Sequence, residues 1–564
     1  MTHILVLLSC ASFLGLLPVS LLAERLGSSW QTGFFQSAAG LFSSAPPRAF
    51  AACGDLQGIW EQNVAAFRGI PYGTPPVGSR RFKPADPAPC WPAGTVFDAS
   101  KNGNICFQSK GGGPGESEDC LNLNVFAPAK ARNLPVFVWI YGGSNVQGSA
   151  ISEFYGPIEN IVRRHPCVLV AMNYRTGTLG YLALEELSAV DPRGVSGNAG
   201  IADQQLALRW VQENIHAFGG DAKRVAIIGQ SSGGTNVLGH LASRSSRGLF
   251  GSAIALSPSA NITMDRATKE AQDAKVILPR TPCANVSKSA LLDCLFSVDA
   301  GLLDAALDPS YSLFDALYDY PTNHQGISSR MSALVFVDGS TITSPLLDAL
   351  ESGLHDVPLL VQSAQAELAV SPAPELENIS RKNLSSFLHR KFDPSYGPKT
   401  TEEIWKLYEH YQPPEYAAYA LDSDSGMACG LRRLAMAARS GFRQPVYWTT
   451  VTGAPSGIMP QIRQMPFHNW DFLAAVGNFA NYGYKPSPRD EAFGERLLDD
   501  WFQLLSKGSL TEERGYRKVQ DMQGQNVIGS TVGSTKTDWH LNHKLEVCTF
   551  WESIGVDQRW WWIN

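Results

Sequence analysis

The sequence predicts an α/β fold in which a mostly parallel central sheet carries helices on both faces, with helical and irregular insertions. Apolar strand candidates alternate with segments of helical spacing, and a glycine-flanked serine follows one of these strands directly. Strands that are apolar at every position are typical of parallel sheets buried on both faces. Alternation of such strands with helices is typical of the α/β class. The apolar runs are residues 135–141, 167–173, 225–228, 253–256 and 357–361.

The elements before the serine can be placed in order. Residues 117–126 open polar and then alternate between polar and apolar, a pattern that predicts an edge strand. The run 135–141 is a candidate for a fully buried strand and ends at two glycines. Helical spacing of apolar residues predicts a helix over 203–214, which leads into the strand 225–228.

The elements after the serine are less regular. Residues 235–242 predict a helix packed on the sheet, and the interval 261–320 is polar, helical and irregular. No linker is long or polar enough to separate independent domains, so residues 53–564 are expected to form a single domain. The remaining predicted elements are a largely helical region 384–438, a strand 444–451, a loop 464–472 and a helix 491–507.

The serine lies in the pentapeptide 229–233, which reads Gly-Gln-Ser-Ser-Gly and fits the pattern G-x-S-x-G. This pattern marks a sharp strand-to-helix turn, called the nucleophile elbow, that exposes its central serine. Side chains two residues to either side of Ser231 would clash, which accounts for the glycines. The N-terminus of the following helix supplies N–H groups and positive potential for a developing oxyanion. The pentapeptide alone is a weak signal, because loops rich in glycine and serine are common.

A nucleophilic serine needs a base, an orienting acid and oxyanion donors. Glycines that could supply oxyanion donors follow a buried strand at Gly143, next to Ser144, although a simple glycine turn explains them equally well. In α/β-hydrolases the acid and then the histidine follow the serine along the chain. His468 is the histidine that lies in a late loop among aromatic residues, and it is either this base or a hydrogen-bonded loop histidine.

The N-terminus predicts entry into the secretory pathway. Residues 1–23 are almost wholly apolar from position 4 onward, which is typical of a secretory signal peptide, with a signal anchor as the alternative. Residues 24–52 are nearly free of acidic side chains and are either a propeptide or a targeting segment for an organelle reached through the secretory route. No later run is long and apolar enough to span a bilayer in the mature chain.

Charge and cysteine content limit the possible partners. The formal net charge of −6 gives no electrostatic case for binding nucleic acid. Ten cysteines include Cys10 in the signal peptide, so nine remain and at least one thiol is free. Cys167, at the start of an apolar run, is the candidate for this buried thiol. Four sequons for N-glycosylation, which suit a secreted chain, begin at Asn261, Asn285, Asn378 and Asn383.

Several long motifs, in the same order, resemble the type-B carboxylesterase/lipase family, which includes cholinesterases and fungal lipases. The resemblance extends from about Gly54 to Val556. The motifs read FRGIPYGTPPVG, SEDCLNLNVF, PVFVWIYGG, NAGIADQQLALRWVQENIHAFGGDAKRVAIIGQSSGG, RGLFGSAIALS and VCTFW. The resemblance implies that residues 53–564 are one catalytic domain with the α/β-hydrolase fold.

The resemblance also implies roles for individual residues. Ser231 would be the nucleophile, Glu367 the acid and His468 the base. The backbone N–H groups of Gly143, Ser144 and Ser232 would form the oxyanion hole. Implied ion pairs join Arg81 to Glu118 and Arg175 to Asp203, and implied disulfides join Cys106 to Cys120, Cys283 to Cys294 and Cys429 to Cys548. Cys53 and Cys90 lie outside the usual set, and their pairing with each other is left open.

The chain departs from the family pattern at several positions. Gln230 and Ser232 stand where the family usually has Glu and Ala, and Ser144 replaces the third glycine of the oxyanion loop. Leu368 follows the acid in place of glycine, so the turn at Glu367 is expected to differ. The loop between Cys106 and Cys120 is short and rich in glycine and lacks tryptophan. This argues against choline esters, which cholinesterases bind by a cation–π contact, and against lipase action through a long lid.

The predicted function is hydrolysis of a small to medium organic ester through an acyl-enzyme formed by a Ser-His-Glu triad. The alternatives are an acyltransferase that uses the same triad and a non-catalytic adhesion protein of the same family. No cofactor or metal is expected, because no Cys/His cluster has the spacing of a zinc site. The expected location is the secretory lumen or outside the cell, and the sequence leaves the oligomeric state open.

Overall fold

A computed structural model describes residues 45–108, 115–307, 334–370, 374–457, 465–521 and 526–556. The predicted signal peptide, most of the segment 24–52, and residues 109–114 of the glycine-rich loop lie outside these ranges. So does the tryptophan-rich C-terminal tail, residues 560–562. Among the described residues, no helix is both long enough and apolar enough to cross a bilayer.

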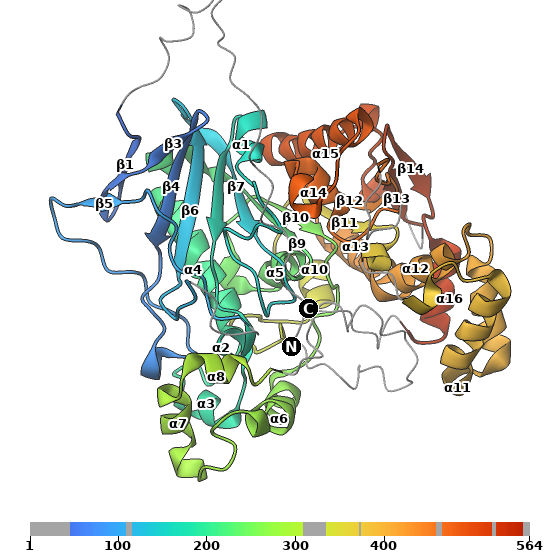
Figure 1. Cartoon of the computed structure of the whole chain (residues 1–564), viewed down its shortest axis with the longest axis horizontal. Helices are drawn as coiled ribbons and strands as arrows, with labels where there is room; N and C mark the ends of the chain where they lie inside the picture. Colours follow the sequence, from blue (N-terminus) through green and yellow to red (C-terminus); the bar gives the residue numbers. More distant parts are fainter. Residues whose placement is uncertain are drawn as a thin grey trace, which may run out of the picture. The chain divides into compact units, whose positions relative to one another are not determined.

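The central element is an eleven-stranded sheet (Figure 1) with the order β14-β13-β12-β11-β10-β9-β7-β8-β6-β4-β3. Neighbouring strands from β8 through β13 are parallel, and antiparallel strands flank this part on both sides. The predicted α/β class with a mostly parallel sheet is therefore confirmed. The strands are β3 (Ile59–Glu61), β4 (Val64–Pro71), β6 (Asn122–Pro128), β7 (Leu134–Ile140), β8 (Val168–Met172), β9 (Gly220–Gln230), β10 (Ser252–Leu256), β11 (Leu359–Ala364), β12 (Val446–Val451), β13 (Ile528–Val532) and β14 (Thr537–Leu541).

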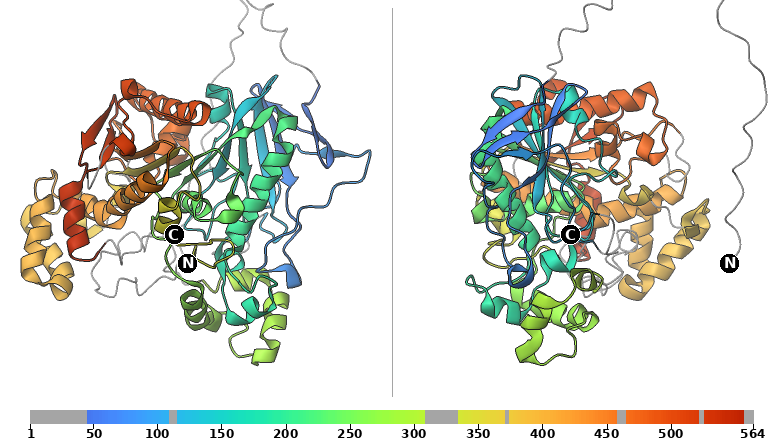
Figure 2. Two further views of the ribbon diagram at one scale, coloured as in Figure 1. Left: turned by 180° about the vertical axis from the view of Figure 1, so that it is seen from behind. Right: turned by 60° about the vertical axis from the view of Figure 1, so that its left-hand side comes forward.

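Helices cover both faces of this sheet, and Figure 2 shows α4 and α15 on opposite sides of it. The faces need this cover because β7 to β12 bury nearly every residue. The helices are α1 (Asn160–Arg164), α2 (Gly177–Tyr181), α3 (Glu185–Val190), α4 (Ala199–Asn214), α5 (Ser232–Leu241), α6 (Arg266–Val276), α7 (Leu291–Ser297), α8 (Ala300–Asp304), α10 (Leu346–Glu351), α11 (Arg381–Tyr408), α12 (Glu415–Ser423), α13 (Cys429–Gly441), α14 (Trp470–Val476), α15 (Pro488–Lys507) and α16 (Leu545–Ser553).

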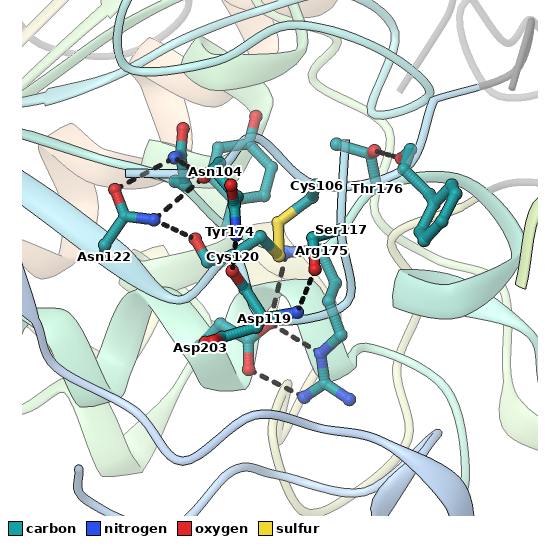
Figure 3. Close-up of a disulfide and its surroundings, with 12 residues drawn as sticks. Asn104, Cys106, Ser117, Asp119, Cys120, Asn122, Tyr174, Arg175, Thr176 and Asp203 are labelled. Atoms are coloured by element: carbon teal, nitrogen blue, oxygen red, sulfur yellow. Dashed lines mark hydrogen bonds and ion pairs between the residues drawn. A yellow bond between two sulfur atoms is a disulfide. The ribbon is translucent and has the colours of Figure 1, made fainter. Parts of the chain in front are cut away.

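The prediction of an edge strand at 117–126 is wrong. The strand there is β6, which lies inside the sheet between β4 and β8. Its polar residues are buried and satisfied by other segments: Asn124 Oδ1 accepts from Gly69 N at 2.8 Å, and Asn122 Nδ2 donates to Asn104 O at 2.8 Å. Figure 3 shows the latter contact. The alternation of polar and apolar residues in this segment therefore comes from buried asparagines and not from a strand with one face in solvent.

Other elements differ from the expected ones in extent. The predicted loop 464–472 contains the start of α14, which begins after Asn469 in the left-handed conformation. The strands β13 and β14 near the C-terminus were not predicted. β1 (Arg48–Ala51), β2 (Gly54–Gln57) and β5 (Val96–Asp98) form a separate three-stranded sheet. Its first strand, β1, lies within the segment 24–52 that was expected to be a propeptide or targeting segment.

The implied cross-links are present. Disulfides join Cys106 to Cys120 (Figure 3), Cys283 to Cys294, and Cys429 to Cys548. Cys53 and Cys90, whose pairing the sequence left undecided, also form a disulfide. Cys167 is a buried free thiol, as predicted. Both implied ion pairs form, each with two hydrogen bonds from the arginine side chain. Arg81 binds Glu118 at 2.6 and 2.7 Å, and Arg175 binds Asp203 at 2.7 Å twice.

Two buried histidines make stability depend on pH. Burial lowers the pKa of His240, which lies on α5 bonded to Ser246 and Gln204, to about 3. Burial likewise lowers the pKa of His543 to about 3. Histidine in an unfolded chain titrates near pH ~6.5, so the unfolded state binds protons there that the folded state does not. We therefore expect the melting temperature to be highest above pH ~6.5 and to fall as the pH drops toward 3.

Thermal melts between pH 7 and pH 5 measure this effect. His240→Gln should flatten part of the decrease, because it removes one of the buried histidines whose pKa is lowered. The control is His410→Gln, a change at an exposed position. If the melting temperature depends on pH equally in His240→Gln and in the control, then His240 does not contribute to the loss of stability at low pH.

Candidate active site

The turn at Ser231 has the geometry of a nucleophile elbow. β9 ends at Gln230, α5 begins at Ser232, and Ser231 between them has φ 60° and ψ −131°. Residues other than glycine rarely adopt a positive φ, so the surrounding structure must hold this conformation. The N–H of Ser231 donates to Leu256 O of β10 at 2.8 Å, which anchors the turn to the neighbouring strand.

Steric contacts explain the glycines of the pentapeptide. A Cβ atom at Gly229 would lie 2.3 Å from the carbonyl oxygen of Gly233. A Cβ at Gly233 would lie 2.2 Å from the carbonyl oxygen of Ile140. Both distances are far shorter than van der Waals contact with backbone atoms, which cannot move aside. The predicted reason for the glycines is therefore confirmed.

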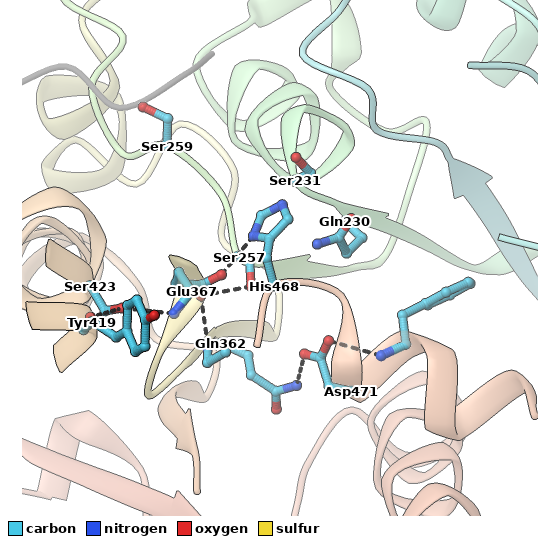
Figure 4. A network of polar contacts seen from close by, with 12 residues as sticks. Gln230, Ser231, Ser257, Ser259, Gln362, Glu367, Tyr419, Ser423, His468 and Asp471 are labelled. Atoms are coloured by element: carbon cyan, nitrogen blue, oxygen red, sulfur yellow. Dashed lines mark hydrogen bonds and ion pairs between the residues drawn. The ribbon is translucent and has the colours of Figure 1, made fainter. Parts of the chain in front are cut away.

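His468 and Glu367 form a buried pair beside the elbow (Figure 4). His468 Nδ1 and Glu367 Oε2 are 2.6 Å apart, and both residues are buried. The backbone adds a second link, because His468 N donates to Glu367 O at 3.2 Å. Figure 4 places Ser231 on the side of the imidazole away from Glu367. The structure thus brings together the three residues that the sequence assigned to the triad.

The carboxylate of Glu367 is held by further donors. Its Oε1 accepts from the backbone N–H of Ala364 at 2.6 Å and from the hydroxyl of Ser257 at 2.9 Å. Its Oε2 is the atom that faces His468. Because both oxygens are bonded, the carboxylate has one defined orientation and presents one oxygen to the imidazole.

A second buried carboxylate lies near the pair and was not predicted. Asp471 Oδ2 accepts from Gln362 Nε2 at 2.6 Å, and Oδ1 accepts from the N–H of Phe472 at 2.8 Å. Burial raises the pKa of Asp471 to about 6, with the charge of Glu367 acting in the same direction. The sequence offered one signal for Asp471, its position three residues after His468. Its partner Gln362 could not be found in this way, because it lies 109 positions away.

The loop after β7 packs directly against the nucleophile. Gly143 and Ser144 have φ values of 123° and 56°, and a Cβ at Gly142 would lie 2.8 Å from Ser231 Cβ. The loop is tied to the elbow because Asn145 N donates to Ser232 Oγ at 2.9 Å. Gly142 is therefore required by its close approach to Ser231, whereas Gly143 lies in a turn of the loop itself, where a Cβ would lie 2.3 Å from Gln147 O.

The turn at Glu367 is held by a serine from another helix. Glu367 N donates to Ser423 Oγ at 2.7 Å, and this hydroxyl donates to Tyr419 O within α12 at 2.7 Å. Ser423 is buried. The side chain of Ser423 thus bonds the backbone of Glu367 from a separate helix. Sequence reasoning did not find Ser423, because the contact spans 56 positions.

We expect Ser423→Ala to lower both stability and turnover. The change leaves the buried N–H of Glu367 without its acceptor, which costs about 1–3 kcal/mol. A less firmly held acid should also reduce kcat, by roughly 3- to 30-fold, since small displacements of positioning groups are costly. Ser425→Ala is the control, because that hydroxyl donates only to carbonyls of its own helical turn. Equal melting temperature and kcat in the two variants would contradict this role.

The groups at the site are of the kinds that acyl transfer requires. They are a hydroxyl, an imidazole, a carboxylate and the backbone N–H groups of the elbow and its neighbouring loop. Across the described ranges, no group of three or more His, Cys, Asp or Glu side chains is arranged to bind a metal ion.

Comparisons with known proteins bear on this geometry. The sequence profile of the carboxylesterase family matches residues 45–551. An acetylcholinesterase of Danio rerio is 42% identical over 253 residues, which are 41% of this chain and 38% of that protein. A para-nitrobenzyl esterase of Bacillus subtilis (strain 168) is 40% identical over 209 residues, which are 36% of this chain and 41% of that protein. These alignments span about two fifths of each relative.

A solved structure of a PNB esterase resembles most of this chain. It superposes with a TM-score of 0.71 at 26% sequence identity, covering 90% of this chain and 100% of that chain.

Proposed function

The chain belongs to the carboxylesterase family, and on this premise we propose that it hydrolyses small to medium carboxylic esters through an acyl-enzyme on Ser231. The observation that carries the proposal is the 2.6 Å contact between His468 Nδ1 and Glu367 Oε2, with Ser231 on the other side of the ring. This arrangement supports the role of His468 as a base that Glu367 holds in place beside the nucleophile.

The first half-reaction forms the acyl-enzyme. Ser231 Oγ attacks the ester carbonyl carbon while His468 Nε2 takes its proton. Glu367 fixes the tautomer in which Nδ1 carries the hydrogen, and it stabilises the imidazolium that forms. When the tetrahedral intermediate collapses, the bond to the alcohol oxygen breaks and His468 returns the proton to that oxygen. Water then repeats these steps on the acyl-enzyme, which releases the acid and restores Ser231.

The oxyanion of each tetrahedral intermediate is assigned to backbone donors. The N–H groups of Gly143, Ser144 and Ser232 are the proposed donors, since Ser232 opens α5 and the loop packs on Ser231. Such donors lower the barrier because they are oriented before charge develops. The helix N-terminus at Ser232 adds favourable potential.

Product analysis tests the proposed reaction. The purified protein is incubated with p-nitrophenyl acetate, with and without 1-butanol, and acetic acid and butyl acetate are quantified. Hydrolysis predicts acetic acid as the main product in both mixtures. Butyl acetate formed in excess over acid would indicate an acyltransferase, and absence of turnover would indicate a non-catalytic family member.

The secretory assignment is a further part of the proposal. The four disulfides are consistent with an oxidising compartment. We propose that residues 1–23 are removed as a signal peptide and that the segment 24–52 precedes the catalytic domain predicted at 53–564, with β1 at the end of that segment paired to β2 of the domain. N-terminal sequencing of the mature protein locates the cleavage site.

The exposure of three sequons supports their modification. Asn285, Asn378 and Asn383 are exposed, and Asn261 is partly buried with its side-chain carbonyl accepting from Thr263 Oγ1 at 2.9 Å. We expect protein from a eukaryotic secretory host to lose mass on treatment with peptide N-glycosidase F, with the exposed sites modified most fully. Intact mass before and after treatment measures this. An unchanged mass would contradict passage of this chain through a glycosylating compartment.

A further inference from the structure

A buried hydrogen-bond donor next to the nucleophile has no partner among the described residues. The side chain of Gln230, the last residue of β9, is fully buried, and its Nε2 atom makes no hydrogen bond there. Buried polar atoms in native structures are almost always paired, and an exception calls for a reason. An unpaired donor of this kind beside a nucleophile is a candidate contact for a polar atom of a bound molecule.

The orientation of the Gln230 amide is fixed from its other end. The hydroxyl of Tyr155 donates to Gln230 Oε1 at 2.8 Å, and the backbone of Gly142 bonds to the same hydroxyl. Burial raises the pKa of Tyr155 well above its usual value, so the hydroxyl keeps its proton. The amide oxygen is thereby committed to Tyr155, and the amide nitrogen must point elsewhere. Figure 4 shows it on the side of His468.

The amide nitrogen of Gln230 lies on the side of the site where the alcohol portion of the ester is expected. In the proposed reaction His468 protonates the leaving oxygen, so the alcohol portion of the ester lies beside the imidazole. The N–H groups of Gln230 are on this side of the site. The oxyanion loop lies at the other end of the amide, because Gly142 is next to the Tyr155 hydroxyl that donates to Gln230 Oε1.

We propose that Gln230 is a specificity-determining residue whose Nε2 donates a hydrogen bond to an oxygen on the alcohol portion of the ester. The preferred substrates are then esters of alkoxy or hydroxy alcohols, rather than those of simple alkyl alcohols. This inference rests on the proposed function, because it takes the position of the leaving group from the role of His468.

The charges around the site agree with a neutral, oxygen-bearing alcohol. The oxygens of Glu367 bind His468, Ser257 and Ala364. Those of Asp471 bind Gln362 and the N–H of Phe472. A neutral donor such as the Gln230 amide attracts an oxygen lone pair and offers nothing to a cationic alcohol.

A matched pair of esters tests this inference. 2-Methoxyethyl acetate and butyl acetate have the same number of heavy atoms and differ by an oxygen in place of a methylene group. The ratio of their kcat/KM values is measured for the full chain, for Gln230→Met and for Gln230→Glu. Comparing this ratio between proteins cancels the intrinsic reactivity of each ester and any change in the basicity of His468.

We expect the ratio to fall about tenfold in Gln230→Met, which is the size of effect from losing one neutral hydrogen bond. Gln230→Glu should reduce it at least as far, because a carboxylate has no hydrogen to donate. Gln503→Met, at a partly buried position on α15, is the control and should keep the original ratio.

Gln230→Glu has nearly the shape of the original side chain, so it decides the question if Gln230→Met does not fold. A ratio unchanged in Gln230→Glu overturns the inference. The proposed function is judged separately by turnover of butyl acetate: activity that Ser231→Ala abolishes supports it, whatever the ratio does.

Discussion

Ser231→Ala should lower kcat/KM for p-nitrophenyl acetate by roughly 10⁴- to 10⁶-fold, the range found when a triad nucleophile is removed. No other hydroxyl can replace it, because Ser231 alone occupies the strained turn between β9 and α5. The fold should survive, since the backbone bond from Ser231 to Leu256 does not involve the hydroxyl. Initial rates measured together with a thermal melt show whether chemistry is lost without unfolding.

Ser259→Ala is the matched control for this change. Ser259 is also buried and lies near the site in Figure 4, but it has no part in the proposed reaction. Its rate should stay close to that of the unmodified protein. Similar losses in both variants would mean that the rate reports general damage, and full activity in Ser231→Ala would exclude the acyl-enzyme.

Glu367→Gln should reduce kcat by about 10⁴-fold, as expected when the acid of a triad becomes an amide. The amide has one acceptor oxygen, whereas the carboxylate now accepts from His468, Ser257 and the N–H of Ala364. If the amide nitrogen faces the imidazole, the histidine adopts the tautomer that cannot take a proton from Ser231. If it faces the other way, it meets a backbone N–H that needs an acceptor.

Glu351→Gln, an exposed change on α10, is the control for removing a negative charge. It should keep its kcat. A kcat for Glu367→Gln within tenfold of the control would show that Glu367 is not the acid of the triad.

Much of the fold was predictable because its signals are local. Strands buried on both faces, such as β7 and β8, must be apolar throughout, and the sequence shows this directly. The elbow was equally local, since a Cβ at Gly229 would meet the carbonyl oxygen of Gly233 within the same pentapeptide. The roles of His468 and Glu367 needed the family motifs, because the spacing of His468 fits a hydrogen-bonded loop histidine as well as a catalytic base.

The features that were missed depend on contacts between distant segments. Gln362 meets Asp471 across 109 positions, and Ser423 meets Glu367 across 56. No periodicity along one segment records such a contact. The error at β6 has the same origin, because Asn124 is satisfied by the backbone of Gly69, 55 positions away. A polar residue in a strand can be buried when a distant segment supplies its hydrogen-bond partner, as Gly69 does for Asn124.

Covalent labelling tests the central claim most directly, because it asks which atom reacts. The protein is inactivated with a fluorophosphonate, digested, and its peptides are mapped by mass spectrometry. We expect one adduct per chain, on Ser231, formed in proportion to the loss of esterase activity and absent from Ser231→Ala. An adduct on another residue, or complete inactivation with Ser231 unmodified, would contradict the assignment of Ser231 as the nucleophile.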